Sequence, residues 1–391
     1  MKKIRLGIVG LGSHGTGHTR NILSGMCPEL EITAVCDIDP ERLAVHKETF
    51  GEFPAFINYS DMIDSGLIDA ILIVTPHYFH PPIAMEAMRK GIHVMCEKPA
   101  GVYTKQVKEM NAVAAECNVS FGMMFNQRTN PTYIKTRELV QNGGFGQIRR
   151  VSWIITNWYR PQAYYDSGAW RATWSGEGGG VLLNQCPHNL DLWQWICGMP
   201  SKVYTKMQCG KWHDIEVEDD VTTIVEYPNG ATGTFVTTTG DCPGSNRLEI
   251  TMDKAKIVVE NNEIHLWELE MTEQEFTATN KIPFCQPKFT YRQVEAPGVE
   301  TAHCGVLNAW AGNILRGEPL VAGGEEGLNG LSISNAMHMS AWTGKEVALP
   351  IDDEVFYQML MERVKTSRRK ENVTSVISDL SNTYNTGSDN K

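Results

Sequence analysis

The chain has 391 residues, and its 35 Lys and Arg stand against 46 Asp and Glu, which gives a formal net charge of −11 at pH 7. This acidic balance argues against a general nucleic-acid or anionic-membrane binder, because binding to phosphates is driven by Lys and Arg. The apolar share of 42% is enough for a full hydrophobic core, and the length suggests two or more domains.

Localisation and metal binding leave little trace in the sequence. No apolar run approaches the ~18 residues that a membrane helix needs, and the basic N-terminus lacks a small-residue cleavage site. We therefore expect a cytoplasmic protein that neither enters a membrane nor binds nucleic acid. The ten cysteines form no Cys-x-x-Cys pair, so neither a zinc ribbon nor a redox motif is indicated.

The first 125 residues alternate short Val- and Ile-rich runs with helical stretches. Strands are predicted at 4–9, 31–36, 70–74, 93–96 and 119–124, and helices at 15–26, 41–50, 82–90 and 104–117. Near-continuous apolar strands separated by helices are typical of a parallel sheet that is covered on both faces. We predict an α/β domain with a doubly wound parallel sheet over residues 1–125.

The pattern changes after residue 126. A helix at 131–141 is followed by alternating strands at 221–227 and 231–239, and the Asn-Gly between them is a strong hairpin signal. Further strands are predicted at 248–252, 257–260 and 264–269, and helices at 185–197, 303–315, 328–342 and 354–369. We predict an α+β domain at 126–369 with a large, mostly antiparallel sheet, and a polar, flexible tail at 370–391.

A glycine-rich loop follows the first predicted strand. Gly10, Gly12 and Gly15 form a G-x-G-x-x-G motif between strand and helix, and Asp37 ends the next strand 22 residues later. Such a loop lets the backbone approach a pyrophosphate at a helix N-terminus, while the acid binds both ribose hydroxyls. We predict NAD binding with Ser13, His14 and Ile38 beside these residues. NADP is less favoured because Asp37 repels a 2′-phosphate, although Arg42 argues the other way, and a ligand-free glycine turn remains an alternative.

Three further segments carry a family resemblance. They are Thr75-Pro76-His77-Tyr78-Phe79-His80, Glu97-Lys98-Pro99 and the run from Gly178 to Asp191, and a C-terminal pattern at 327–350 accompanies them. With the glycine loop, they resemble the glucose–fructose oxidoreductase / inositol dehydrogenase / rhizopine-catabolism (Gfo/Idh/MocA) family over residues 4 to about 365. The resemblance implies a Rossmann domain, a second domain with an open-faced sheet, hydride transfer between nicotinamide and a sugar or cyclitol, and a homodimer or homotetramer.

The resemblance also implies roles for individual residues. His188 is the expected base and Lys98 the cation on the substrate oxygen, which suits a His pKa near ~6.5 and a Lys at the carboxyl end of a parallel strand. Taken alone, a structural histidine and a surface lysine are the commoner interpretations. The remaining cofactor contacts are expected at Thr75, Pro76, His80, Glu97, Lys98 and Asn126.

One position departs from the family pattern. Family members commonly carry Asp four residues before the histidine, and this chain has Asn184 there. An amide orients a hydroxyl but accepts no proton, so we expect Asp191, on the same helical face, to tune His188 instead. His77 and His80 form His-x-x-His without an evident third ligand, and no metal is expected.

Seven aromatic side chains fall between residues 153 and 174. Trp153 fits a strand and the core, whereas the others lie among loop residues and charged donors, where exposed rings suit sugar faces. Simple loop packing is the alternative. The expected substrate contacts are Arg128, Trp158, Tyr159, Trp170, Arg171, Asn184 and His188.

Three functions remain open from the sequence. The leading one is an NAD-dependent oxidoreductase that acts on a secondary alcohol of a sugar, cyclitol or glycoside. The second is a glycoside-processing enzyme that uses tightly bound NAD transiently for oxidation and elimination, without net redox change. The third is a non-catalytic nucleotide-binding regulator, because a fold does not fix a function.

Overall fold

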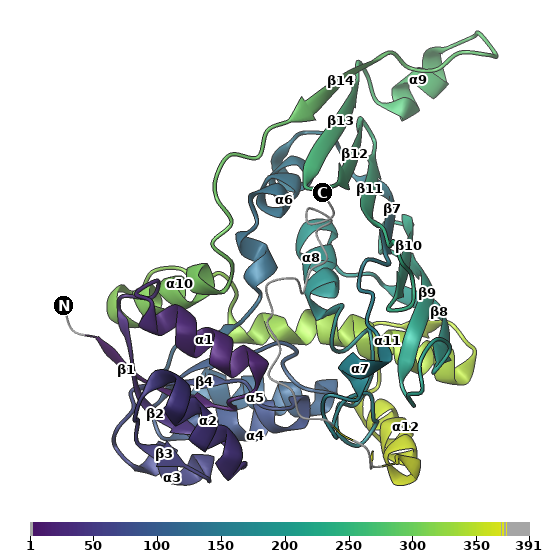
Figure 1. Ribbon diagram of the computed structural model, residues 1–391. Coiled ribbons are helices and arrows are strands. Elements are labelled where there is room, and N and C mark those ends of the chain that lie inside the picture. The colour runs from purple at the N-terminus through teal and green to yellow at the C-terminus, as the bar shows by residue number, and fades with distance from the viewer. Residues whose placement is uncertain (1–2, 369, 371–372, 374–391) are drawn as a thin grey trace.

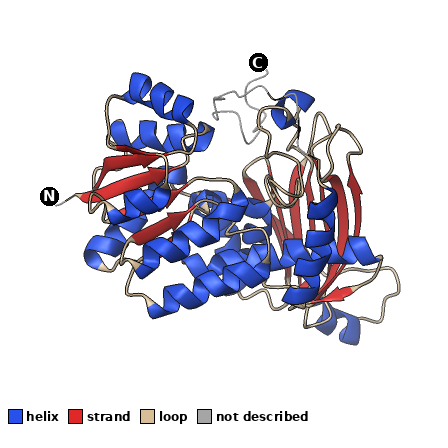
Figure 2. Cartoon of the chain, turned by 90° about the horizontal axis from the view of Figure 1, so that it is seen from below, coloured by secondary structure: helices blue, strands red, loops and turns tan. Residues whose placement is uncertain are grey.

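The computed structural model describes residues 3–368, 370 and 373. Two sheets lie at opposite sides of the molecule, and helices fill the space between them (Figures 1 and 2). The polar tail predicted at 370–391 lies outside the described residues, apart from Lys370 and Val373. Within the described residues, no helix is long and apolar enough to cross a membrane.

The first sheet has six parallel strands in the order β3-β2-β1-β4-β5-β6. They are β1 (Ile4–Val9), β2 (Leu30–Cys36), β3 (Ala55–Phe56), β4 (Ala70–Ile73), β5 (His93–Cys96) and β6 (Phe121–Met123). The connecting helices are α1 (Ser13–Leu23), α2 (Pro40–Phe50), α3 (Tyr59–Asp64), η1 (His77–Phe79), α4 (His80–Arg89) and α5 (Thr104–Glu116). The chain starts in the middle and winds to both sides, so the predicted doubly wound sheet is confirmed.

Two helical segments, η2 (Asn126–Thr129) and α6 (Pro131–Asn142), lead from the first sheet to the second. The first sheet also receives a later segment, α10 (Ala302–Arg316), whose Trp310 packs in one buried cluster with Leu6 and Ile8 of β1. A boundary drawn at residue 125 assigns α10 to the other domain. The Rossmann core is therefore completed by a helix that lies far downstream in the sequence.

The second sheet has nine strands in the order β14-β13-β12-β11-β7-β10-β9-β8-β15. They are β7 (Ile148–Ile155), β8 (Lys202–Cys209), β9 (Glu218–Glu226), β10 (Thr232–Thr238), β11 (Asn246–Met252), β12 (Ala255–Glu260), β13 (Glu263–Leu269), β14 (Phe289–Val294) and β15 (Val347–Ala348). Every neighbouring pair is antiparallel except β7 and β10. This confirms the mostly antiparallel sheet, and β9 and β10 form the predicted Asn-Gly hairpin.

One face of this sheet packs on helices and the other is open (Figure 1). Besides α6 and α10, the helices after residue 130 are α7 (Gln162–Tyr165), α8 (Pro187–Cys197), α9 (Glu273–Thr279), η3 (Gly324–Glu326), α11 (Gly327–Thr343) and α12 (Asp353–Thr366). Trp193 of α8 stacks on Phe235 of β10 with ring centroids 5.0 Å apart, and both side chains are fully buried. Burial therefore fixes α8, and the residues at its N-terminus, against the sheet.

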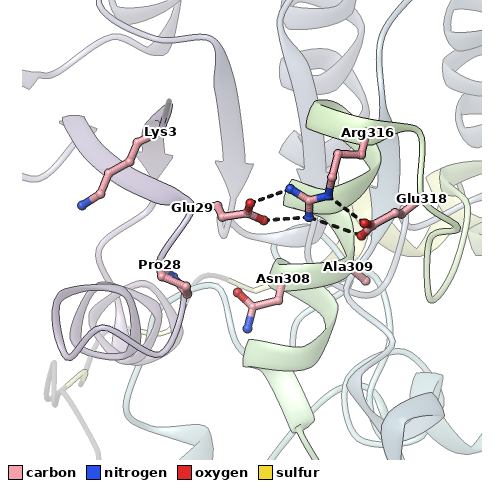
Figure 3. A pocket seen from close by; sticks show the side chains of 7 residues that line it. All are labelled: Lys3, Pro28, Glu29, Asn308, Ala309, Arg316 and Glu318. Atoms are coloured by element: carbon pink, nitrogen blue, oxygen red, sulfur yellow. Dashed lines mark hydrogen bonds and ion pairs between the residues drawn. The ribbon is translucent and has the colours of Figure 1, made fainter. Parts of the chain in front are cut away.

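A surface hollow of about 670 Å³ lies at the amino ends of the parallel strands (Figure 3). Arg316 of α10 binds Glu29, before β2, at 2.5 Å and Glu318 at 2.7 Å. The pair with Glu29 connects α10 to the first sheet, while the pair with Glu318 is local. Ligands of open α/β sheets bind at the opposite, carboxyl edge, and there the candidate site lies.

Candidate active site

The glycine loop has the geometry that close contact with a phosphate group requires. Gly10 has φ +94°, and a Cβ there would lie 2.5 Å from the carbonyl oxygen of Val74. A Cβ at Gly15 would lie 2.0 Å from the carbonyl oxygen of Gly10, so neither position accepts a side chain. Helix α1 begins at Ser13, directly after Gly12, which has no side chain to cap it. The first N–H groups of α1 therefore face the loop and form an anion-binding site.

Asp37 lies beneath this loop at the end of β2. Its side chain is buried, Oδ2 accepts a hydrogen bond from the Leu11 N–H at 2.7 Å, and Oδ1 accepts one from the Asp39 N–H at 3.0 Å. Arg42 pairs with Asp39 at 3.6 Å and reaches to within 3.3 Å of a Cβ placed on Gly12. The loop thus has an acceptor on one side and a guanidinium on the other.

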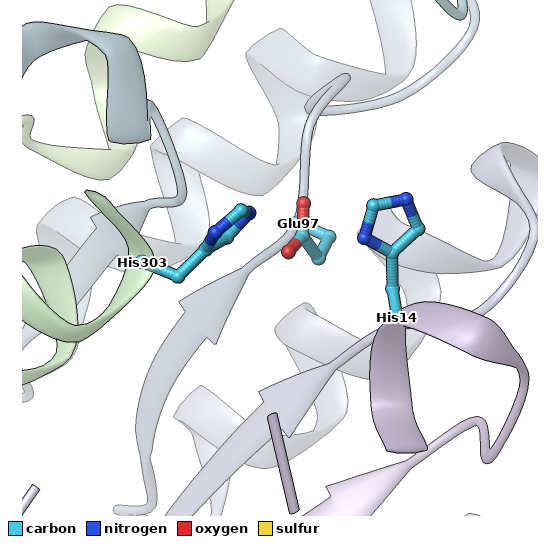
Figure 4. Close-up of side chains that lie close together, drawn as sticks. All are labelled: His14, Glu97 and His303. Atoms are coloured by element: carbon cyan, nitrogen blue, oxygen red, sulfur yellow. The ribbon is translucent and has the colours of Figure 1, made fainter. Parts of the chain in front are cut away.

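A cluster of histidines surrounds Glu97, the residue after β5 (Figure 4). Glu97 Oε1 binds His18 Nε2 at 2.7 Å, and burial lowers the pKa of His14 to about 3 and that of His303 to about 4. The neighbouring imidazoles hold the pKa of Glu97 well below its usual range, against the effect of burial. At neutral pH a carboxylate therefore lies among uncharged rings of His14 and His303.

This cluster is the part of the described chain that could hold a metal ion, since ligand atoms of His14, Glu97 and His303 lie within 4.8 Å of one another. The sequence prediction missed His18 and His303. His18 lies one helical turn after His14, a spacing that could have indicated it. His303 starts α10, far along the chain, and no local pattern could have placed it here.

The two histidines of the His-x-x-His motif contact different segments of the chain. His80 contacts the carbonyl oxygens of Pro99, through Nδ1 at 2.7 Å, and Thr75, through Nε2 at 2.6 Å. His77 Nδ1 instead contacts the carbonyl oxygen of Glu177 at 3.1 Å. Both ring nitrogens of His80 therefore lie against backbone oxygens, and the side chain joins the loops that follow β4 and β5.

Lys98 and His188, the two expected catalytic residues, come from different domains and meet at this edge. Lys98 Nζ donates a hydrogen bond to the carbonyl oxygen of Asn184 at 2.9 Å, and burial lowers the pKa of its ammonium. His188 lies in the first turn of α8 with 5% of its surface exposed. Burial and the charge of Lys98 lower the pKa of His188 well below its usual value, so the imidazole is in its basic form at pH 7.

The expected pairing of Asp191 with His188 is wrong. The carboxylate of Asp191 binds Arg128 through two hydrogen bonds, Nε–Oδ2 at 2.8 Å and Nη2–Oδ1 at 2.6 Å. Helix α8 begins at Pro187, so Asn184 precedes it and does not share a helical face with His188. The predicted helix at 185–197 started two residues too early.

Arg128 also has a different role from the expected one. Its side chain is 1% exposed, and Nη1 binds Glu326 Oε2 at 2.6 Å while the other nitrogens hold Asp191. A guanidinium that is buried and paired in this way is not available to a substrate. It joins η2, α8 and the start of α11 behind the site.

The aromatic segment only partly matches the expected exposed platform. Trp153 is fully buried, as predicted, but Trp158, Tyr165 and Trp174 are buried as well. The Nε1 of Trp158 donates to Asn189 Oδ1 at 3.1 Å. For these three rings the alternative of loop packing is correct.

Arg171 lies against two of the remaining aromatic side chains of this segment. Arg171 lies over the rings of Tyr164, at 4.5 Å, and Trp170, at 4.7 Å, and its Nη1 donates to the Tyr164 hydroxyl at 2.9 Å. Burial and, to a smaller extent, the charge of Arg171 lower the pKa of Lys98. Tyr159 is 42% exposed. Of the expected substrate contacts in this segment, Trp170, Arg171 and Tyr159 keep exposed surface.

Comparisons with known proteins agree with this description. Residues 4–125 match the model of an oxidoreductase family with an NAD-binding Rossmann fold, and residues 133–258 match the Gfo/Idh/MocA C-terminal domain. Myo-inositol 2-dehydrogenase of Thermotoga maritima is 23% identical over 354 residues, which is 88% of this chain and 98% of the relative. An inositol 2-dehydrogenase of Corynebacterium glutamicum is 26% identical over 50% of this chain and 55% of its own length.

Among solved structures, the WlbA dehydrogenase from Bordetella pertussis in complex with NADH and UDP-GlcNAcA has a TM-score of 0.75 at 29% identity, over 90% of this chain and 100% of that one. A levoglucosan dehydrogenase shares the fold, with a TM-score of 0.73 at 20% identity over 89% of this chain and 100% of that one. Fold, loop and matches together define an NAD-binding oxidoreductase. The chain belongs to the Gfo/Idh/MocA family.

Proposed function

We propose that this protein oxidises a secondary alcohol of a sugar or polyol with NAD⁺, or reduces the corresponding ketone with NADH. The observation that carries the proposal is the meeting of Lys98 and His188 at the carboxyl edge of the parallel sheet, next to the glycine loop. Burial and the charge of Lys98 both lower the pKa of His188, which is 5% exposed, and Lys98 itself is half-buried. NAD, when bound, supplies the hydride acceptor.

In this proposal the two side chains divide the remaining chemistry between them. The neutral imidazole of His188 accepts the hydroxyl proton of the substrate, because its lowered pKa keeps it unprotonated at neutral pH. The ammonium of Lys98 donates a hydrogen bond to the same oxygen and stabilises the negative charge that develops there. In the reverse direction His188 returns the proton.

The family and the loop 158–171 support a polyhydroxylated substrate. Two relatives bear the names of inositol and levoglucosan dehydrogenases, and the WlbA dehydrogenase was solved in complex with UDP-GlcNAcA. Trp170 and Tyr159 offer apolar ring surface, and Arg171 offers hydrogen-bond donors beside Lys98. Sugars present both an apolar C–H face and hydroxyl acceptors, which this combination fits.

The test is a screen for NADH absorbance with sugars, inositols and glycosides, followed by two variants. We expect Lys98→Ala and His188→Ala to lower kcat by about 10² to 10⁴-fold, which is the usual contribution of a positioned acid or base. Both should still quench or enhance NADH fluorescence on binding. Lys90→Ala removes an exposed lysine that pairs with Asp64 and serves as the control.

Two results would contradict the proposal. Unchanged kcat in both variants would show that the assigned residues are not catalytic. Product that forms with no net NADH, from protein that retains its NAD, would favour the transient use of the cofactor in oxidation and elimination.

We also propose that the chain works as a homodimer or homotetramer. The outer face of the nine-stranded sheet supports this, because Ile154 of β7 and Ile224 of β9 are 41% and 53% exposed. Thr234 of β10 pairs with Ile224, and Val236 pairs with Ile154, so the two isoleucines lie on the same face. Apolar side chains that are grouped on an exposed face mark a candidate surface for contact with another subunit.

A further inference from the structure

Glu177 is a buried carboxylate beside the proposed site that no motif singled out. Its side chain is 2% exposed and lies in the loop before α8. Oε1 accepts a hydrogen bond from the side-chain amide of Asn184, and Oε2 accepts one from the Ala172 N–H at 2.5 Å. Ala172 has φ +55°, a conformation that non-glycine residues seldom adopt. The backbone is thus held in a costly conformation at the point where it contacts this carboxylate.

The contact with Glu177 fixes the orientation of Asn184. A carboxylate only accepts hydrogen bonds, so the Nδ2 of Asn184 must face it, and Oδ1 is directed away as an acceptor. The backbone oxygen of the same residue accepts the hydrogen bond from Lys98 Nζ at 2.9 Å. Asn184 is therefore held between the carboxylate of Glu177 and the ammonium of Lys98.

Glu177 is one of two carboxylates whose negative charge favours the ammonium form of Lys98. Burial and the guanidinium groups of Arg171 and Arg160 lower the pKa of Lys98, whereas Glu97 and Glu177 raise it. Glu97 already forms a hydrogen bond with His18. Loss of one of these two carboxylates therefore makes the cationic form of Lys98 harder to keep.

We propose that Glu177 is a positioning residue of the active site, which orients Asn184 as a hydrogen-bond acceptor for a substrate hydroxyl and serves as a counter-charge to the ammonium of Lys98. The inference rests on the proposed function. It assigns to residue 177 the negative charge that an amide at position 184 cannot provide. The acceptor at Asn184 then selects substrates with a hydroxyl next to the carbon that is oxidised.

A second buried carboxylate stands behind Glu177. Burial raises the pKa of Glu177, and the charge of Glu218 adds to this effect, while Arg171 and the hydrogen bonds from Ala172 and Asn184 lower it. Glu218 itself lies 3.2 Å from His338 and accepts the Leu182 N–H at 3.0 Å. Four charged groups act on the pKa of Lys98, and they are Glu97, Glu177, Arg160 and Arg171. The charge of Lys98 in turn acts on the pKa of His14, His77, His80, Cys186, His188 and His303.

The test moves the carboxylate rather than merely removing it. Glu177→Gln keeps a side chain that can pair with the amide of Asn184 but loses the charge. In Glu177→Gln/Asn184→Asp, the carboxylate introduced at position 184 accepts from the amide introduced at position 177, and the net charge equals that of the natural chain. A purely structural role for Glu177 predicts that these variants change stability while the titration of Lys98 stays where it is, because a glutamine amide cannot accept from both Ala172 and Asn184.

The first readout is the titration midpoint of Lys98. It is obtained from the pH dependence of the rate at which acetic anhydride acetylates Lys98, quantified by mass spectrometry with no substrate present. We expect the midpoint for Lys98 to move to lower pH in Glu177→Gln and to return to the natural value in the double variant. Glu216→Gln, which removes another carboxylate that holds a backbone N–H of this loop, at Trp174, is the matched control. An unmoved midpoint in Glu177→Gln would overturn the proposal.

The second readout is the pH profile of kcat with levoglucosan, or with myo-inositol if levoglucosan is not oxidised. We expect a drop of tenfold or more in Glu177→Gln, recovery in the double variant and unchanged NADH binding in both. A single variant as active as the natural chain, or a double variant no better than the single one, contradicts the proposal. If Glu177→Gln fails to fold, the double variant alone provides the test. A Lys98 midpoint in the double variant that differs from the natural value also contradicts the proposal. Failure of the proposed function is separate: it shows as unchanged kcat in Lys98→Ala and His188→Ala.

Discussion

We propose that single side chains set the preference of this site between NAD and NADP. Asp37 is held by two backbone N–H groups, of Leu11 and Asp39, so its carboxylate stays in one place at the end of β2. Such an acid is suited to the ribose hydroxyls of NAD and repels the extra phosphate of NADP. Arg42, close to Gly12, carries the opposite charge and would attract that phosphate.

This balance leads to a prediction for Asp37→Asn. The amide keeps one acceptor oxygen but loses the negative charge, so we expect KM for NAD⁺ to rise and the preference for NAD⁺ over NADP⁺ to fall by about tenfold, which corresponds to ~1.4 kcal/mol. Steady-state rates with both cofactors give the ratio. Asp64→Asn, which removes an exposed charge in the same domain, should leave it unchanged. A ratio equal to that of the natural chain would show that Asp37 does not face the ribose.

At the scale of elements, the position of α8 matters most, because this helix carries His188. One turn after its start, this helix carries Asp191, whose carboxylate binds Arg128 of η2. The pair therefore joins the crossover segment, which begins directly after the Rossmann strands, to the helix that carries the proposed base. Both side chains are 1% exposed, so the pair is not weakened by water.

We predict that Asp191→Asn lowers the free energy of unfolding by about 3 kcal/mol, because it leaves the buried guanidinium of Arg128 short of one partner. The remaining pair with Glu326 limits the loss. Urea unfolding monitored by circular dichroism measures it, and kcat should fall as α8 shifts. Glu138→Gln, in the exposed pair with Lys135, should change stability by less than ~1 kcal/mol. An equally small effect of Asp191→Asn would mean that the buried pair does not hold α8.

The elements that the sequence predicted are those with a buried pattern or a turn signal. The five longer parallel strands and the β9–β10 hairpin are of this kind, whereas the two-residue β3 was missed. Strand β14 was missed because five of its six residues are exposed, so hydrophobicity carries no signal there. In β8 the partly exposed Tyr204 interrupts the alternation of polar and apolar residues. Helix α9 could have been found, since Thr272 and Glu275 form a capping box.

The candidate site was predictable only where its residues belong to local motifs. Gly10, Asp37, Lys98 and His188 each follow a strand or begin a helix within a recognisable pattern. The residues that act on the pKa of Glu97 and Lys98 come from distant segments: His303 lies in α10 and Glu177 in an irregular loop. Contacts between residues so far apart, or in segments without periodicity, are determined by tertiary packing and leave no spacing to detect.

For the whole molecule, the remaining question is what covers the open face of the nine-stranded sheet. We predict that light scattering gives the mass of a dimer or tetramer, and that Ile154→Glu/Ile224→Glu gives a monomer, because two charges on this face would have to be buried without partners. Val45→Glu, at an exposed apolar position of α2, is the control, since it should leave the mass unchanged. A monomeric natural chain at all working concentrations, or an unchanged mass of the double variant, would show that this face is not the interface.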